Sequence, residues 1–210
     1  MSNEVKTKAK VEMDPKYIIK LTVTLFVTCV VVAGLLGMVN QVTLPNITAA
    51  NKAKTEAAMQ QVVADPEGSS FSDALEITAE MNGAAASAGA KVTEAYEVQV
   101  GGAPAGYALK IVASGSQGNI EMMVGVDAEG VITGVSIVKN SETAGIGSKV
   151  MANEPTAAGV GVLSQFVGKS AADGALSVGT NVDAISGATV SSRGVTTGVN
   201  AALAVAGVMG

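Results

Sequence analysis

The residue types best suited to chemistry lie in one short segment that directly precedes a stretch with a helical pattern. It reads Asp183-Ala184-Ile185-Ser186-Gly187-Ala188-Thr189. Gly187 permits a tight turn, and the free N–H groups and positive dipole end of a helix that starts near Thr189 favour a phosphate. The Thr189 hydroxyl is therefore a candidate to carry a phosphate ester. Because the 210-residue chain contains no His and shows no evident base, we expect a separate enzyme to form that ester.

A purely structural interpretation of the same segment needs no ligand. Ser186 or Thr189 would then cap the helix by accepting a hydrogen bond from a free N–H group, and Ser-Gly-Ala-Thr would be a turn of small residues. Taken alone, the segment favours this interpretation.

A second candidate segment follows the last predicted strand. It reads Asn140-Ser141-Glu142-Thr143-Ala144-Gly145-Ile146-Gly147-Ser148-Lys149. Gly145 and Gly147 let main-chain N–H and C=O groups approach a flat ligand, while Ile146 offers an apolar contact. Glu142 and Thr143 could bond the polar edges of a ring, although Glu142 also fits a solvated loop carboxylate. A loop of this kind is weak evidence by itself.

Composition narrows the classes of function. The net charge of −5 argues against a nucleic-acid partner. A single Cys, Cys29, allows no internal disulfide and no Cys-based metal site. Because the chain also has no His and Cys29 lies in a long apolar stretch, we predict neither a metal site nor a catalytic residue. Aromatic residues make up only 3% of the chain, so a planar ligand would rest on aliphatic side chains, Met and backbone. We expect Tyr96 and Tyr107 to belong to the core.

An uncharged segment between Lys20 and Lys52 predicts a membrane helix. Its apolar part, 21–39, together with Ile18 and Ile19 just before it, gives about 22 residues or ~33 Å of helix, which matches a hydrocarbon core of ~30 Å, so we expect the membrane helix at 18–40. A cleavable signal peptide fits less well, because its apolar region is about 7–15 residues long and ends at a small-x-small site. Cys29 lies inside this span, where we expect it to face lipid or another helix; a metal ligand shared with a partner subunit is the alternative.

The lysines predict the orientation of this helix. Five precede the uncharged segment, namely Lys6, Lys8, Lys10, Lys16 and Lys20, whereas only Lys52 and Lys54 follow it closely. The positive-inside rule therefore places residues 1–17 in the cytoplasm and the rest of the chain, beyond the span, on the outer face of the cell membrane.

The remaining chain predicts one α+β domain joined to the membrane helix. Residues 41–90 are expected to form a juxtamembrane helix, 51–64, which ends before Pro66, and a linker whose Gly/Ala-rich part, 82–90, is a surface loop. Residues 91–210 are the domain. Period-two patterns predict strands at 92–100, 107–113, 119–126 and 131–138, and their hairpin signals indicate a mainly antiparallel sheet. Helices are expected at 158–167 and 190–208, and extended chain at 175–185.

Together, the two candidate segments resemble those of a known family. Asp183 to Thr189 is similar to the sequence at which flavin transferases attach FMN, through its phosphate, to the final Thr. Glu-Thr-Ala-Gly-Ile-Gly at 142–147 resembles the Glu-Thr-Pro-Gly-Leu-Gly segment of FMN-binding domains, with Ala144 in place of Pro. With the membrane helix, residues from about 18 to the end resemble the G subunits of Rnf complexes, which are ion-translocating ferredoxin:NAD oxidoreductases.

The resemblance implies a role for each segment. Thr189 would be the FMN attachment residue, and Asp183, Ser186, Gly187 and Ala188 its recognition sequence. The residues beside the flavin ring would be Glu142, Thr143, Gly145, Ile146 and Gly147. FMN accepts two electrons and releases them one at a time, which suits an electron-transfer subunit. The implied partners are the other membrane subunits of the complex, a flavin transferase during maturation, and membrane lipid.

Two other functions fit parts of the sequence. The C subunit of the sodium-pumping NADH:quinone reductase resembles this chain and is usually longer. A membrane-tethered structural or sensory domain without a covalent cofactor would explain the helix, the fold and the charge, but it leaves both motifs without a role.

Overall fold

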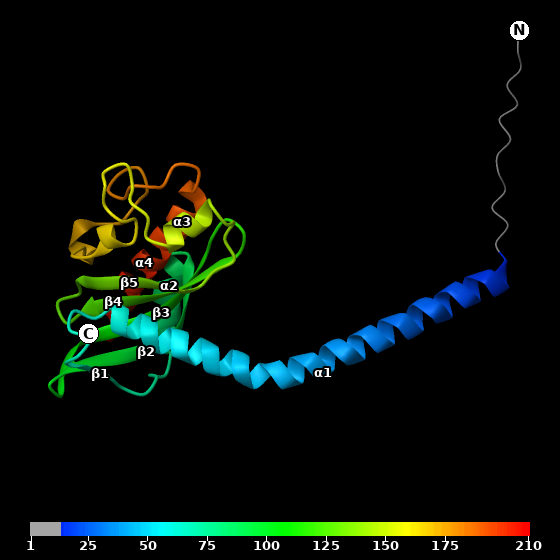
Figure 1. Ribbon diagram of the computed structural model, residues 1–210. Helices are drawn as coiled ribbons and strands as arrows, with labels where there is room; N and C mark the ends of the chain where they lie inside the picture. The colour runs from blue at the N-terminus through cyan, green and yellow to red at the C-terminus, as the bar shows by residue number, and fades with distance from the viewer. Residues whose placement is uncertain (1–13) are drawn as a thin grey trace, which may run out of the picture. The chain divides into compact units, whose positions relative to one another are not determined.

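The computed structural model describes residues 14–210 (Figure 1). The predicted cytoplasmic segment, residues 1–17, therefore falls mostly outside the described residues. The chain forms two compact units, which divide after Ala50. This division falls within the first helix.

Helix α1 spans Pro15–Gln61 and contains the predicted membrane segment. By length and composition it is long and apolar enough to cross a membrane, and large side chains such as Leu25 and Phe26 are exposed. The Thr24 and Thr28 hydroxyls donate to main-chain carbonyls one turn back, each at 2.8 Å. These hydroxyls are thus satisfied inside the helix, as a threonine in a lipid environment requires.

The juxtamembrane helix predicted at 51–64 is present, but it is the last part of α1 and ends at Gln61 rather than before Pro66. A close contact with the sheet explains the earlier end. The Val62 carbonyl accepts a hydrogen bond from Thr133 Oγ1. A Cβ atom at Gly125 or Gly134 would overlap the main chain of Val62. The chain therefore leaves the helix where its backbone meets the sheet.

The domain contains a five-stranded sheet in which every neighbouring pair is antiparallel, in the order β1-β2-β3-β4-β5. The strands are β1 Ser69–Phe71, β2 Ala90–Val100, β3 Ala103–Ser114, β4 Asn119–Asp127 and β5 Ile132–Lys139. The α+β class and the four predicted strands are confirmed. The fifth strand, β1, was not expected, because three residues are too few to show a period.

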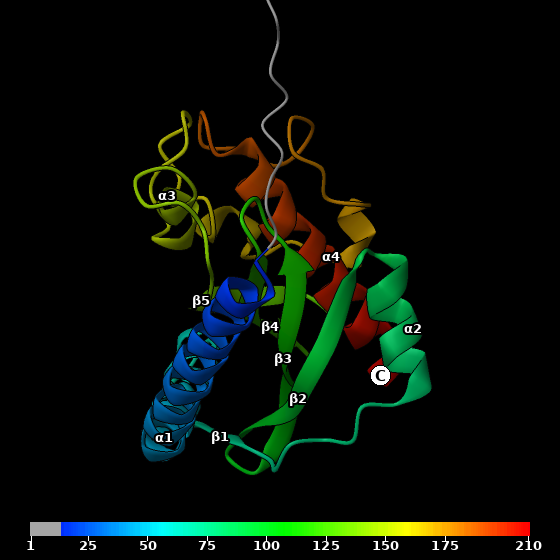
Figure 2. The same cartoon turned by 90° about the vertical axis from the view of Figure 1, so that its right-hand side faces the viewer.

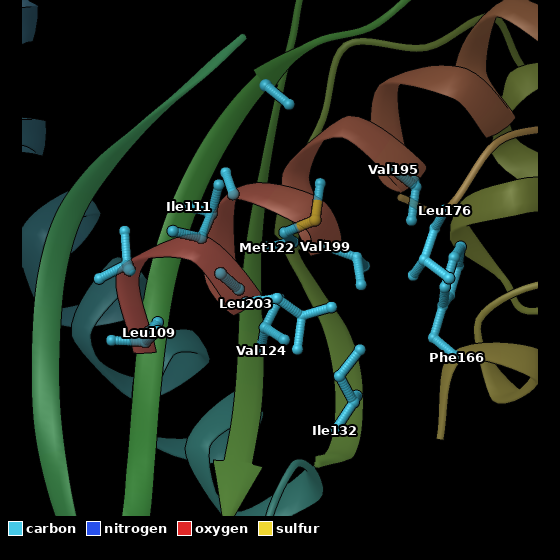
Figure 3. Packing of buried hydrophobic residues seen from close by; sticks show 14 of the residues in the cluster. Leu109, Ile111, Met122, Val124, Ile132, Phe166, Leu176, Val195, Val199 and Leu203 are labelled. Carbon is cyan, nitrogen blue, oxygen red and sulfur yellow. The ribbon is translucent and has the colours of Figure 1, made fainter. Parts of the chain in front are cut away.

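The two faces of the sheet are covered by different helices (Figure 2). Helix α4, Thr189–Met209, and helix α2, Ala79–Ser87, cover one face, and the last turns of α1 cover the other. Figure 3 shows Met122 of the sheet beside Val199 of α4, and Leu109 belongs to the same buried cluster. Met123 is buried on the opposite face against Met59 of α1, as the alternation of side chains along a strand requires.

Three predicted elements differ in the structure. The prediction of a Gly/Ala-rich loop at 82–90 is wrong, because most of these residues belong to α2. Alanine is the strongest helix former, the Thr78 side chain caps α2 by accepting from Met81 N–H, and Met81 and Ala85 are buried.

The helix predicted at 158–167 is reduced to one 3-10 turn, Ser164–Phe166, and residues 175–185 contain only an isolated bridge. Side-chain amides hold both segments in irregular paths. Asn153 Oδ1 accepts from the Leu163 and Ser164 N–H groups, and Asn200 both donates to and accepts from the Leu176 main chain. The other short helices are α3, Gly147–Met151, and the 3-10 turn Ala171–Asp173.

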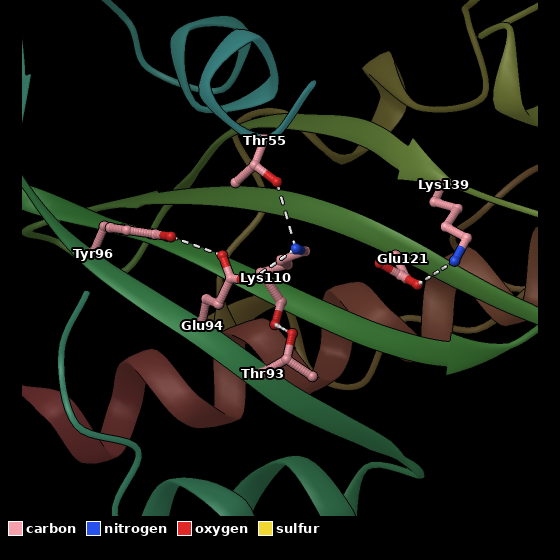
Figure 4. A network of polar contacts seen from close by, with 7 residues as sticks. All are labelled: Thr55, Thr93, Glu94, Tyr96, Lys110, Glu121 and Lys139. Atoms are coloured by element: carbon pink, nitrogen blue, oxygen red, sulfur yellow. Dashed lines mark hydrogen bonds and ion pairs between the residues drawn. The ribbon is translucent and has the colours of Figure 1, made fainter. Parts of the chain in front are cut away.

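A polar network joins α1 to the sheet within the domain (Figure 4). Lys110 Nζ contacts Glu94 Oε1 at 2.8 Å and Thr55 Oγ1 at 3.4 Å, and Tyr96 donates to Glu94 Oε2 at 2.7 Å. Partial burial acts to raise the pKa of Glu94, but the hydrogen bonds from Lys110 and Tyr96 and the charge of Lys110 outweigh it and lower that pKa. Burial, then the Glu94 carboxylate, raises the pKa of Tyr96 to about 12.

Replacing Lys110 with Met is expected to cost roughly 1 kcal/mol of unfolding free energy, because Glu94 loses its charged partner while Tyr96 still donates to it. A carboxyl group whose pKa is lower in the folded state stabilises the protein at pH values above its pKa in the unfolded chain, here 4.5. This stabilisation is lost as the pH falls below that value. The Lys110→Met variant should therefore show a weaker loss of stability below pH 4.5. Urea unfolding of the full chain in mild detergent, at pH 7 and pH 4, measures both effects.

Lys139→Met is the matched control, since Lys139 pairs with Glu121 at 3.6 Å but its side chain is 64% exposed. An equal loss of stability in the two variants would contradict the assigned role of the Lys110 network.

Candidate functional site

Helix α4 begins at Thr189 after a tight turn. Ala188 N–H donates to the Ile185 carbonyl at 2.9 Å across this turn. Gly187 has a φ of 81°, a left-handed conformation that favours glycine, which confirms the predicted glycine turn. The Ser-Gly-Ala-Thr segment thus directs the chain into the helix and places Thr189 in its first turn.

The predicted side-chain cap is wrong. Ala188 occupies the N-cap position, and no side chain of the described residues caps α4. The Ser192 hydroxyl donates a hydrogen bond to the Ala188 carbonyl, one turn earlier. The Ser192 N–H makes the first main-chain hydrogen bond of the helix, also to the Ala188 carbonyl. The N–H groups of the first turn of this 21-residue helix are therefore left without a side-chain acceptor, which suits an anionic group.

The two candidate segments meet in one pocket of about 150 Å³. Both contribute to its wall, together with the loop of the β3–β4 hairpin. Its lining residues are Ser116, Glu142, Thr143, Ile146, Gly147, Gly187, Ala188, Thr189, Val190 and Ser191. The pocket thus brings the phosphate candidate, Thr189, together with the loop predicted to face a flat ligand.

Glu142 occupies the centre of this arrangement. Its Oε1 accepts hydrogen bonds from the main-chain N–H groups of Ser116, at 2.8 Å, and Gln117, at 3.2 Å. Its Oε2 accepts from the Ser191 hydroxyl in the first turn of α4. The alternative that Glu142 is only a solvated loop carboxylate is therefore wrong, because it bonds three donors from two other segments.

Three predicted site residues lie outside the pocket lining. Gly145 has a φ of 77° and donates its N–H to the Ser148 hydroxyl at 2.8 Å, so it shapes the loop. Ser186 is exposed in the turn, and the Asp183 side chain is also exposed. The Asp183 main chain is held by Gln165, whose side-chain amide accepts from its N–H at 2.7 Å and donates to its carbonyl at 2.9 Å.

Sequence reasoning missed three residues that line the pocket, namely Ser116, Val190 and Ser191. Ser116 belongs to a hairpin far from both motifs in the sequence, so no local pattern could connect it with them. The position of Val190 next to Thr189 was the only signal available for it. Tyr96 and Tyr107 do not line the pocket; both pack against the buried core, as expected.

The residues present fit FMN. The uncapped N–H groups at the start of α4 suit its phosphate, and Thr189 lines the same pocket. Ile146 and Val190 are 50% and 54% exposed at the same pocket, so they offer aliphatic surface to a planar ring. Within the described residues no group of three or more His, Cys, Asp or Glu could hold a metal ion.

Comparison with known proteins supports this assignment. Residues 115–204 match the family model of the FMN-binding domain. The match begins at the β3–β4 hairpin loop and includes both candidate segments.

The chain is also similar to named proteins over nearly its whole length. It is 36% identical to the G subunit of the Na(+)-translocating ferredoxin:NAD(+) oxidoreductase complex of Acetobacterium woodii, over 96% of this chain and 97% of that protein. It is 30% identical to the G subunit of the ion-translocating oxidoreductase complex of Methanosarcina acetivorans, over 90% of this chain and 95% of that protein. One long apolar N-terminal helix fits a single-pass component of a membrane complex. The chain therefore belongs to the family of G subunits of ion-translocating oxidoreductase (Rnf) complexes, which contain an FMN-binding domain.

Proposed function

We propose that this chain carries FMN bound covalently, through a phosphoester to Thr189, and transfers electrons within a membrane-bound ferredoxin:NAD+ oxidoreductase complex. The observation that carries the proposal is the pocket in which the 142–147 loop meets Thr189 at the uncapped start of α4. The relative from Acetobacterium woodii, named for this reaction, supports the choice of complex.

Each part of the pocket has a role toward the cofactor. The first-turn N–H groups of α4 hold the phosphate, and the helix dipole stabilises its negative charge by about 0.3–1 kcal/mol. Ile146 and Val190 contact the ring, while Thr143 and the main chain around Gly147 offer polar partners to its edges. When bound, FMN supplies the electron-transfer chemistry. The protein supplies its position.

The attachment segment also serves a second enzyme. Asp183, Ser186, Gly187 and Ala188 form the recognition sequence for a flavin transferase, and the exposed side chains of Asp183 and Ser186 are open to such a partner. The chain itself has no His to activate Thr189.

The membrane helix fixes the location of the cofactor. Residues 18–40 span the cell membrane, residues 1–17 stay in the cytoplasm, and residues 41–90 connect the span to the FMN-binding domain, 91–210, on the outer face. Membrane lipid and the other subunits of the complex are the partners. Tethering raises the effective concentration of the flavin near those subunits without a strong interface.

Thr189→Ala should abolish covalent flavin, because it removes the hydroxyl proposed to carry the phosphoester while the other hydroxyls of the pocket, on Ser116, Thr143 and Ser191, remain. In-gel fluorescence after SDS denaturation, from cells that hold the transferase, measures the bound flavin. Intact-protein mass spectrometry should show the wild-type polypeptide plus one FMN less one water.

Thr180→Ala is the matched control, since Thr180 is exposed and does not line the pocket. It should keep full fluorescence. A dark wild-type band would favour the tethered structural or sensory domain instead. Co-purification with quinone-reductase subunits would assign the chain to that complex.

The orientation is testable with cysteine labelling in a Cys29→Ser background. A membrane-impermeant thiol reagent should label Thr180→Cys on intact right-side-out vesicles. It should label Ser2→Cys only after the membrane is opened. The reverse pattern would place the FMN-binding domain in the cytoplasm.

A further inference from the structure

Glu142 is the one ionisable side chain among the residues that line the described pocket. Both of its oxygens are already bonded to protein donors from other segments, namely the hairpin N–H groups of Ser116 and Gln117 and the hydroxyl of Ser191. Each contact is a donor directed at the carboxylate. Glu142 is therefore engaged in hydrogen bonds within the protein. It is not free to serve only as a hydrogen-bonding partner for a ring edge.

Two glycines show that the fold makes room for this carboxylate. A Cβ atom at Gly115 would overlap Glu142 Oε1, and a Cβ atom at Gly147 would overlap Glu142 Oε2 and crowd the Ser191 hydroxyl. Neither glycine has a positive φ. Their lack of a side chain is thus needed for the space that Glu142 fills, not for an unusual backbone conformation.

We propose that Glu142 is a positioning residue that fixes the β3–β4 hairpin to the first turn of α4, and that its negative charge lowers the reduction potential of the flavin in this pocket. The inference rests on the proposed function. Ser191 lies two residues after Thr189, so the bond to Glu142 holds the turn that carries the attachment hydroxyl. The same carboxylate lines the pocket wall, so its charge acts directly on the site.

The electrostatic part follows from the charge balance of the couple. Two electrons and one proton added to the oxidised ring leave one extra negative charge on it. A carboxylate at the same pocket repels that charge, and the repulsion is strong because partial burial weakens screening by water. The oxidised form is therefore favoured, and the reduced flavin gives up its electrons more readily to the next carrier.

Glu142→Gln separates charge from position. The Gln carbonyl can accept from Ser116 and Gln117 N–H, and its amide can donate to the Ser191 hydroxyl, which then turns to act as acceptor. This variant keeps the links and removes the charge. Ser191→Ala does the opposite, since it breaks the link to α4 and keeps the charge.

The first measurement is hydrogen–deuterium exchange of the full chain without flavin, made in cells that lack the transferase. In peptides covering residues 114–119, Glu142→Ala should exchange at least tenfold faster at the Ser116 and Gln117 amides, because it removes their acceptor. Glu142→Gln should stay within threefold of wild type. Unchanged exchange in Glu142→Ala would overturn the positioning role, and if that variant does not fold, faster exchange at residues 189–192 in Ser191→Ala decides instead.

The second measurement is a redox titration of the flavin-loaded full chain. Glu142→Gln should shift the two-electron equilibrium at least tenfold toward the reduced flavin, which is about 30 mV more positive. Ser191→Ala should shift it less than threefold.

Glu154→Gln is the matched control for the second measurement, because Glu154 is exposed and lies outside the pocket. It should leave the potential unchanged. A Glu142→Gln potential equal to that of wild type overturns the electrostatic role. A wild-type chain without flavin would refute the proposed function instead, and the exchange measurement still decides the positioning role.

Discussion

The packing of α4 across the sheet is the constraint on which the site depends. Two glycines of the helix let it approach closely, because a Cβ atom at Gly194 would crowd the Ser114 carbonyl and one at Gly198 would overlap the Met122 side chain. Val195 and Val199 then fill the core against the sheet. This contact fixes which part of α4 crosses the end of β3, and so it fixes where the helix begins. Thr189 stands beside the β3–β4 hairpin for that reason.

The polar links near the pocket depend on this packing. The hairpin loop, the segment after β5 and the first turn of α4 are each irregular or terminal, so regular main-chain bonding does not hold them to one another. Glu142 supplies the acceptor for donors from two of them. A buried or half-buried carboxylate is stabilised when several donors surround it, and the donors are ordered in return. Apolar packing thus brings the segments near, and one carboxylate fixes their final arrangement.

The opposite face of the sheet packs against the end of α1. The last turns of α1 pack there through Ala58 and Met59, and Lys110, Glu94 and Thr55 add a polar link. The end of the helix that contains the membrane segment is therefore part of the domain core.

The sequence by itself determined the long apolar N-terminal helix, four of the five antiparallel strands, the long C-terminal helix and both motifs, because each depends on local composition or on a short period along the chain. It also identified most of the residues that line the pocket, through the two motifs. Tertiary structure alone decided that these motifs meet, that Ser116 and Ser191 join them, and that Glu142 bonds the protein instead of water. The physical reason is that a hydrogen bond between segments far apart in the chain depends on how the helix packs on the sheet. The same holds for the irregular segments after β5, where side-chain amides such as Asn153 replace the regular main-chain bonds that a local pattern could predict.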